Sequence, residues 1–421
     1  MKKTTVFIFL LLSAAAVKAQ QTSTSPYSSF GMGDDRRNGD LIISSMGGIG
    51  TTYVSELGNE ANFSNPAANR NLNYASFNVA LTTDAVQSKT SDEKYSRSTS
   101  YLSNLSLAFP AGKNSRMGVI LQPYTSVGYD IHIDNDTEKS LLTGRGGLHT
   151  AALMYSRNLN KELSLGAKVG YVWGELEKNE EIAVLNAPLI NGTKNIQDFS
   201  FFDYTLGVTY QKKLKKDHKL TLGATYSLGH NTDTDVDFLR STYYYNSQGV
   251  ITSRDTLNYI NGKRTTKIPS SYTVGVAYGK ELKWALALEG KYIQQSAMKI
   301  PEDNAEYRDK YRIALGGWLL PNFNSFKSYF SRVIYRYGIY YENSGLMVNN
   351  HEINQWGVSV GAGFPIGKRG QGQSNPSMIN IGIEAGQKGA KTYGLIKEDF
   401  VSLKIGFNFD DAFWFKKRKY D

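Results

Sequence analysis

The chain has 421 residues, 20% of them charged, and a formal net charge of +10. It contains no cysteine, which excludes disulfide frameworks, thiolate metal centres and cysteine catalysis. No segment reaches the ~20 consecutive apolar residues that a membrane-spanning helix needs, so we expect no helical anchor. The 28 tyrosines and 19 phenylalanines favour β-structure.

Residues 1–19 have the layout of a secretory signal peptide. A charged start, Met1-Lys2-Lys3, precedes the apolar stretch 6–12, and Val17-Lys18-Ala19 resembles a small-residue cleavage site. We predict cleavage after Ala19 and export of a chain that begins at Gln20. Export excludes nucleic acid as a partner, so the basic net charge needs no such explanation.

Residues 20–71 show no strand alternation and contain two motifs, Met46-Gly47-Gly48-Ile49-Gly50 and Asn65-Pro66-Ala67. The stretches 41–46 and 53–63 hold enough apolar residues to pack against other structure. We therefore predict a compact hatch (plug) segment that sits inside the barrel described next. A disordered periplasmic tail is the alternative.

From residue 72 to residue 409 the chain alternates apolar and polar residues with the period of β-strands. In the last strand, Leu403, Ile405 and Phe407 share one face while Lys404 and Asn408 share the other. With the export signal, this pattern predicts an all-β fold, a transmembrane antiparallel β-barrel whose apolar face meets lipid. A soluble sheet packed on a core is the alternative. We predict fourteen strands near residues 72–82, 99–109, 116–133, 145–158, 162–175, 199–212, 218–230, 270–280, 281–296, 306–319, 331–342, 353–364, 377–387 and 398–409.

The connections between these strands form a short set and a long set. An even number of strands places both termini on one side, and outer-membrane barrels carry their short turns on the periplasmic side. We therefore expect periplasmic termini and long extracellular loops, the longest of which, 231–269, is expected to form a small hairpin. The tail 410–421 carries Lys416, Lys417, Arg418 and Lys419, which suit either docking to an acidic partner or plain solvation.

Pro123 interrupts the predicted third strand. A proline donates no ladder hydrogen bond, and a closed barrel has no free edge to receive it. We expect the strand to kink or bulge there, with Tyr124, Ser126 and Gly128 in the altered part of the wall. The kink would open a lateral gate towards lipid. A harmless bulge near the rim is the alternative.

The alternation also turns charged side chains towards the lumen, where we expect paired networks that stiffen the barrel. These side chains are Lys168, Lys283, Glu289, Lys291, Arg312, Arg336, Glu384 and Lys404. The five histidines show no metal-binding spacing, and no nucleophile motif accompanies them. We expect no catalytic residue, no metal and no cofactor, and therefore no enzyme activity.

Two of these features resemble the FadL-type family of outer-membrane proteins. They are the motif 46–50 followed by Asn65-Pro66-Ala67, and Pro123 followed by Ser126-Val127-Gly128-Tyr129. The resemblance implies a fourteen-stranded barrel, an N-terminal hatch and a kinked third strand that opens laterally. It implies uptake of hydrophobic, fatty-acid-like molecules, with the hatch at residues 46–50 and 65–67 and the gate at Pro123.

Other segments resemble a branch of that family that includes relatives of the PorV shuttle protein and accessory barrels of assembly machines. They are Tyr335-Arg336-Tyr337-Gly338, Phe364-Pro365-Ile366 and the ending Trp414-Phe415-Lys416-Lys417-Arg418-Lys419. The basic tail departs from the transporter pattern. Two functions stay open: uptake of hydrophobic small molecules, and a non-transporting accessory subunit of an outer-membrane secretion or barrel-assembly complex. The expected partners are outer-membrane lipids, with either a hydrophobic ligand or other complex subunits.

Overall fold

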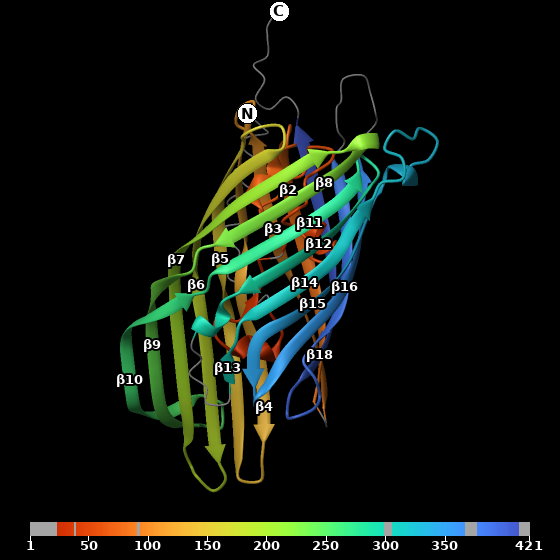
Figure 1. The fold of residues 1–421 in the computed structure, drawn as a ribbon. Helices are drawn as coiled ribbons and strands as arrows, with labels where there is room; N and C mark the ends of the chain where they lie inside the picture. Colours follow the sequence, from red (N-terminus) through yellow and green to blue (C-terminus); the bar gives the residue numbers. More distant parts are fainter. Residues whose placement is uncertain (1–22, 38, 91–92, 299–304, 367–376, 412–421) are drawn as a thin grey trace, which may run out of the picture.

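Fourteen antiparallel strands close into a barrel in this computed structural model, which describes residues 23–37, 39–90, 93–298, 305–366 and 377–411 (Figure 1). The last wall strand pairs with the first, from Lys397 opposite Lys89 to Asp411 opposite Ala75. The predicted fold class and strand number are confirmed. In order around the wall, the strands are β2 (Ala75–Lys89), β3 (Lys94–Pro110), β4 (Ser115–Asp134), β5 (Glu138–Asn158), β6 (Leu163–Val184), β7 (Ile190–Lys213), β8 (His218–Ser227), β11 (Ser271–Lys280), β12 (Trp284–Ile293), β14 (Lys310–Leu319), β15 (Ile334–Val348), β16 (His351–Pro365), β17 (Met378–Lys388) and β18 (Lys397–Asp411).

The remaining elements are not strands of this ring. They are β1 (Asp34–Asp35), β9 (His230–Tyr245), β10 (Ile251–Ile268), β13 (Ala305–Tyr307), the helix α2 (Leu41–Ser44) and the 3-10 turns η1 (Pro26–Ser29), η2 (Pro66–Asn69), η3 (Lys215–Asp217), η4 (Gln295–Ala297) and η5 (Phe330–Arg332). We call the end of the barrel with the turns 111–114, 159–162 and 214–217 the turn end, and the opposite end the hairpin end. In Figure 1 the turn end is at the top.

The wall has an apolar outer face and a polar inner face. On β18, Val401, Leu403 and Phe409 are each about half exposed on the outside, whereas Lys404 and Asn408 are buried on the inside. Period-2 alternation produces this arrangement directly, because successive side chains of a strand point to opposite faces. A band of exposed Leu, Val, Ile and Tyr side chains would be unfavourable in water, and it suits a barrel surrounded by lipid.

The long loops expected at the hairpin end are largely strand. The predicted loop 176–198 is mostly the β6–β7 hairpin, and 231–269 forms the β9–β10 hairpin, which is much larger than predicted and projects from the wall (Figure 1). β9 pairs with β10 and with the far part of β7. These extensions have polar residues on both faces, so their sequences lack the alternation that marks the membrane-facing part.

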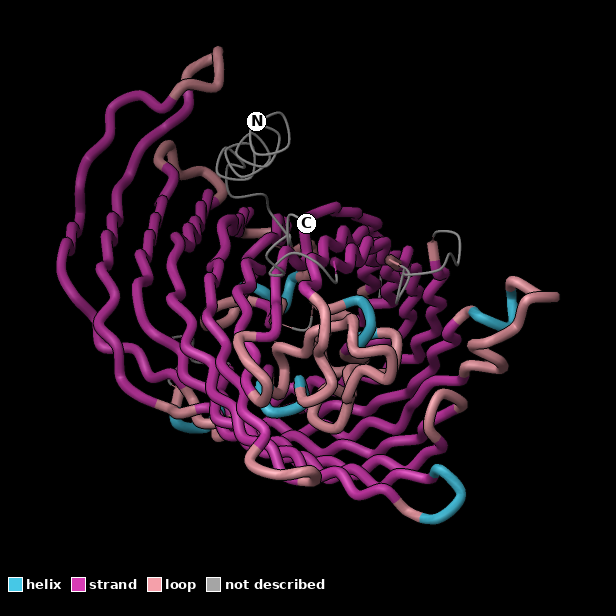
Figure 2. Tube along the Cα trace, turned by 90° about the horizontal axis from the view of Figure 1, so that it is seen from above, coloured by secondary structure: helices cyan, strands magenta, loops and turns pink. Residues whose placement is uncertain are grey.

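The N-terminal segment 23–74 lies within the ring of strands (Figure 2). Its short helix α2 is buried, with Leu41, Ile42 and Ile43 at most 3% exposed. Asp40 caps this helix, because its side chain accepts hydrogen bonds from the amides of Ile42 and Ile43 at 2.9 and 3.1 Å. The apolar residues expected to pack in this segment therefore do so against the inside of the wall.

Candidate functional site

The glycine-rich motif 46–50 turns back against the wall directly after α2. Gly47 and Gly48 adopt positive φ angles of 69° and 81°, and the Gly48 amide donates to the Ile43 carbonyl at 3.0 Å, which closes the helix end. A Cβ at Gly48 would collide with the Arg312 guanidinium of β14. The Gly47 amide donates to the Ser359 hydroxyl of β16 at 2.8 Å. Both glycines are thus required by conformation and by close contact with the wall.

A carboxylate of β12 holds the next residues. The amides of Gly50 and Thr51 both donate to one oxygen of Glu289, at 3.0 and 2.7 Å. Glu289 is buried, and these two donors compensate the cost of removing its charge from water. Asn65 donates to the Thr51 carbonyl at 2.7 Å, so the two sequence motifs of the N-terminal segment meet in space.

The motif Asn65-Pro66-Ala67 forms the start of η2. The Asn65 side chain accepts from the Ala67 amide at 3.0 Å and donates to the Thr209 hydroxyl of β7 at 3.0 Å. Pro66 rests against Gly166 of β6, where a Cβ would have no room. These positions contact β6 and β7, on the side of the wall opposite to the strands that Gly47 and Gly48 contact. Their role in a hatch stays a prediction.

Buried ion pairs connect the N-terminal segment to the wall at further points. Arg336 of β15 lies 3.0 Å from Glu60, with both side chains at most 3% exposed, and also donates to Asn380 at 2.9 Å. Asp34 pairs with Lys388 of β17 at 2.8 Å. Removing one member of a buried pair leaves an uncompensated charge, so these contacts resist displacement of the segment.

The wall is interrupted between β3 and β4. Their ladder ends at Leu105 opposite Leu121, and in the described residues the two strands are not paired beyond that point. The register of β4 against β5 shifts between Pro123 and Thr125. Because proline lacks an N–H group, the ladder cannot continue unchanged at Pro123. The bulge that the sequence predicted is therefore present, and it adjoins an opening in the wall, the β3–β4 gap.

The N-terminal segment occupies the β3–β4 gap. Strand β1 pairs antiparallel with β4, with Asp34 opposite Ser126 and Asp35 opposite Thr125. The next amide, that of Arg36, donates to the Tyr124 carbonyl at 2.9 Å. The edge of β4 that β3 leaves unpaired is thus partly satisfied by the chain's own N-terminal segment.

Arg36 also reaches the other side of the gap. Its guanidinium lies 2.8 Å from the Asp84 carboxylate of β2 and 3.3 Å from the Tyr101 hydroxyl of β3. Near the hairpin end, Arg97 of β3 lies 3.3 Å from the Asp130 carboxylate of β4. The backbone of Arg36 is therefore fixed to one edge of the gap and its side chain to the other.

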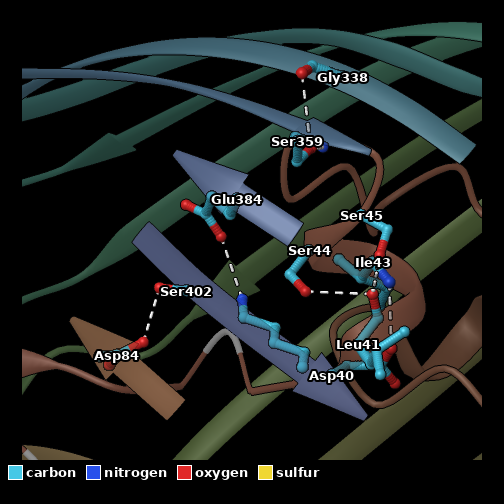
Figure 3. Close-up of polar contacts among 12 residues, drawn as sticks. Asp40, Leu41, Ile43, Ser44, Ser45, Asp84, Gly338, Ser359, Glu384 and Ser402 are labelled. Carbon is cyan, nitrogen blue, oxygen red and sulfur yellow. Dashed lines mark hydrogen bonds and ion pairs between the residues drawn. The ribbon is translucent and has the colours of Figure 1, made fainter. Parts of the chain in front are cut away.

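A cavity of about 320 Å³ lies between the N-terminal segment and the wall. Charged groups of both signs line it: Asp34, Asp35, Arg36, Arg37, Asp84, Lys291, Lys310, Arg312, Glu342, Glu384, Lys388, Glu398 and Lys404. Asp84 accepts from Ser402 at 2.6 Å, and Glu384 contacts the Lys404 ammonium at 3.0 Å. Figure 3 shows Asp84, Ser402 and Glu384 on their strands. Apolar and aromatic side chains, among them Phe30, Met32 and Ile293, share the lining with these charged groups.

Most of the charges predicted to face the lumen do so, but Lys283 does not. It lies exposed in the turn before β12 and donates to the Pro321 carbonyl, because β12 begins at Trp284 and not at residue 281 as predicted. Asp40 is the clearest electrostatic anomaly outside the wall. Burial, followed by the nearby Glu60 carboxylate, raises the pKa of Asp40 to about 6.

Several predicted features fall outside the described residues, among them the signal peptide and Lys416, Lys417, Arg418 and Lys419. Among the residues that the structure describes, no group of three or more His, Asp or Glu side chains could hold a metal ion. In the same residues, no helix is long and apolar enough to cross a membrane. Sequence reasoning missed Arg36 and Glu60; the charged run Asp34-Asp35-Arg36-Arg37 within a glycine-rich segment was the available signal.

The fold is shared with a solved hydrocarbon channel, a FadL homologue and a toluene transporter. The chain is 14% identical to the monoaromatic hydrocarbon channel CymD, with a TM-score of 0.57, 88% of this chain covered and 97% of CymD. A FadL homologue from Pseudomonas aeruginosa gives 9% identity and a TM-score of 0.62, covering 93% of this chain and 100% of that one. The Pseudomonas putida toluene transporter TodX is 17% identical to this chain, with a TM-score of 0.55, and the match covers 89% of this chain and 98% of TodX.

Identities this low establish a common fold and no more. No curated protein matches the sequence. A family model described as BamG, in contrast, matches residues 1–421, the whole chain. This protein, a FadL-like barrel by fold, therefore belongs to the BamG family.

Proposed function

We propose that this barrel is a non-transporting accessory subunit of an outer-membrane barrel-assembly complex. Membership of the BamG family over the full chain supports a role in barrel assembly. The observation that carries the proposal is how firmly the N-terminal segment is joined to the wall. It is tied to the wall by buried pairs such as Glu60–Arg336, and it fills the β3–β4 gap through Arg36.

Transport through such a barrel would require many of these contacts to break together. Each buried ion pair that loses a member costs about 3–5 kcal/mol. The cavity beside the segment carries many charged side chains among its apolar ones, so an apolar molecule that passed through it would also have to lie against charged groups. A plug of this kind makes the barrel a rigid body, which suits a subunit that acts through its surfaces.

For orientation we propose that the turn end faces the periplasm, with both termini on that side. The support is the general layout of outer-membrane barrels, whose periplasmic turns are short. The basic residues Lys416, Lys417, Arg418 and Lys419 would then be available to an acidic periplasmic partner.

The second candidate is uptake of hydrophobic small molecules. The β3–β4 gap at Pro123 favours it, as does the fold shared with the hydrocarbon channel CymD and the toluene transporter TodX. In that case residues 46–50 and 65–67 would move as a hatch, and Pro123, Tyr124, Ser126 and Gly128 would form the lateral gate. Pro123→Ala would then change uptake, whereas an accessory subunit should tolerate it.

Native mass spectrometry of the protein extracted from its own membranes in mild detergent tests the proposal. An accessory subunit should co-purify stoichiometrically with a larger barrel or with periplasmic subunits, and without a bound lipid-like ligand. A variant truncated after Asp411 serves as a matched probe of the basic tail, because the truncation leaves the β18–β2 closure intact. A lone barrel that carries a releasable fatty acid would refute the proposal and favour the second candidate.

A further inference from the structure

The connection between β14 and β15 differs from the other turns at the turn end. It spans residues 320–333, which we call the interface loop, and it projects sideways from the wall in both views (Figures 1 and 2). Three rings are displayed on it: Phe326 is 88% exposed, Phe330 66% and Tyr329 42%. Exposed aromatic groups of this size mark a contact surface.

The interface loop is built as a defined structure. Its two ends, Leu320 and Val333, are fully buried, and the Leu320 amide donates to the Lys283 carbonyl at 2.6 Å. Within the loop, the Asn322 amide donates to the Ser331 carbonyl at 2.7 Å. The rings are therefore held outward by a fixed scaffold.

Hydrogen bonds from two tyrosine hydroxyls fix the position of the interface loop relative to the wall. Tyr335, which faces outward near the start of β15, donates to the Phe330 carbonyl at 3.2 Å. Tyr329 donates to the Pro365 carbonyl at the end of β16 at 3.0 Å. Phe330 thus lies beside the outer face, at the level where the apolar band of Tyr335 and Tyr337 ends.

Cationic side chains accompany the rings. Lys327 is exposed next to Phe326, and the Arg332 guanidinium lies 5.2 Å from the centre of the Tyr329 ring. Aromatic rings with flanking Lys and Arg at the edge of an apolar band are the composition that sits at the boundary between acyl chains and phosphate headgroups.

We propose that the interface loop inserts Phe326 and Phe330 into the headgroup region of the bilayer leaflet at the turn end, with Lys327 and Arg332 facing lipid phosphates. The partner is a phospholipid surface that contains anionic lipid. Continuity with the lipid-facing wall favours lipid over a protein partner, because the loop extends sideways from the wall at the height of its apolar edge. The inference does not depend on the proposed function, since a transporter would use the same anchor.

The absence of native cysteine allows a single label to report on the loop. Phe326→Cys, carrying a nitroxide, is reconstituted in vesicles of phosphatidylethanolamine and phosphatidylglycerol, and the label's collisions with oxygen and with a water-soluble nickel complex are compared by spin resonance. Lys113→Cys is the matched control, because it lies in the exposed β3–β4 turn at the same end, which has no aromatic residue. Phe330→Cys provides a second reporter in case the first variant folds poorly.

The proposal predicts an oxygen-to-nickel ratio severalfold higher at 326 and 330 than at 113. Equal ratios at the loop and the control would overturn it, because the rings would then lie in water. If the loop labels are water-accessible in vesicles but shielded in native membranes, a protein covers the loop and the lipid assignment is wrong. None of these results depends on whether partner subunits co-purify with the barrel.

Discussion

Arg36 is the residue that joins the two edges of the β3–β4 gap. Its amide is bonded to Tyr124 on β4, and its side chain pairs with Asp84 on β2. The neighbouring Asp84 and Asp34 carboxylates and Tyr101 keep the pKa of Arg36 above its usual value although burial opposes the charge. A single residue therefore couples the N-terminal segment to the integrity of the wall.

The Glu60–Arg336 pair allows a direct test of how firmly the segment is held. Glu60→Gln should destabilise the protein by about 3–5 kcal/mol, because the fully buried Arg336 loses its counter-charge. Combining it with Arg336→Met removes the second charge and should recover a large part of the loss. Protease resistance of residues 23–74 and thermal unfolding measure both effects. Equal stability of the single variant and wild type would show that the pair does not hold the segment.

Asp40 gives a pH-dependent prediction. Its pKa is raised from an ordinary value near 4 to about 6, so folding disfavours the charged form, and its contribution to stability is lost as the pH rises from about 4 to about 6. Asp40→Asn keeps a cap but has no charge, and should be about 2–3 kcal/mol more stable than wild type above about pH 7.

The same pair of proteins should be equally stable below about pH 3, where Asp40 is largely protonated in both the folded and the unfolded chain. Asp40→Ala is the control, because it removes the cap and should be less stable than Asp40→Asn at every pH. Thermal unfolding across the pH range gives the comparison. A difference between wild type and Asp40→Asn that does not change with pH would contradict the raised pKa.

At the scale of elements, the β9–β10 hairpin and the barrel are separable. β8 pairs with β11 from Ser227 opposite Ser271 to His218 opposite Lys280, so the wall is complete without the hairpin. The hairpin instead lengthens the sheet beyond the wall by pairing with β7. The β9–β10 hairpin therefore projects from the molecule, and its strand pairs are not needed to close the wall.

Replacing residues 229–269 with Asn-Gly should therefore leave a folded barrel, since two residues suffice for a hairpin turn between paired strands. Heat-modifiable mobility on a gel and thermal unfolding report the closure. Deleting residues 271–280, the wall strand β11, is the control and should abolish folding. Loss of the folded form in the hairpin deletion would show that β9 and β10 are needed to close the wall.

At the scale of the whole molecule, the sequence predicted the strands of the wall well and the contacts of the N-terminal segment with the wall poorly. The fourteen wall strands were found because each alternates apolar and polar residues where it faces lipid and lumen. The extensions such as β9 and β10 were predicted as loops because their sequences carry polar residues on both faces and lack a regular alternation. Pro123 indicated the bulge because a proline inside a strand cannot donate a ladder hydrogen bond.

The contacts between the N-terminal segment and the wall could not be predicted from the sequence for a different reason. Glu60 and Arg336 are separated by 276 residues, and they meet only after the ring closes around the segment. The motifs 46–50 and 65–67 were identified through residues with unusual backbone roles, yet nothing local indicated that Glu289 would receive the Gly50 and Thr51 amides. The role of the segment as a moving hatch stays a prediction.

The most direct test of a sealed accessory barrel is to lock β1 to β4 with a disulfide. Asp35 and Thr125 are opposite each other in the ladder, and the chain has no other cysteine, so Asp35→Cys with Thr125→Cys forms a single reducible link. The measurement compares the oxidised and reduced variants in cells for outer-membrane protein assembly and for uptake of a labelled fatty acid. The account predicts equal assembly in both forms and no uptake that depends on reduction. Uptake that stops on oxidation and returns on reduction would contradict it.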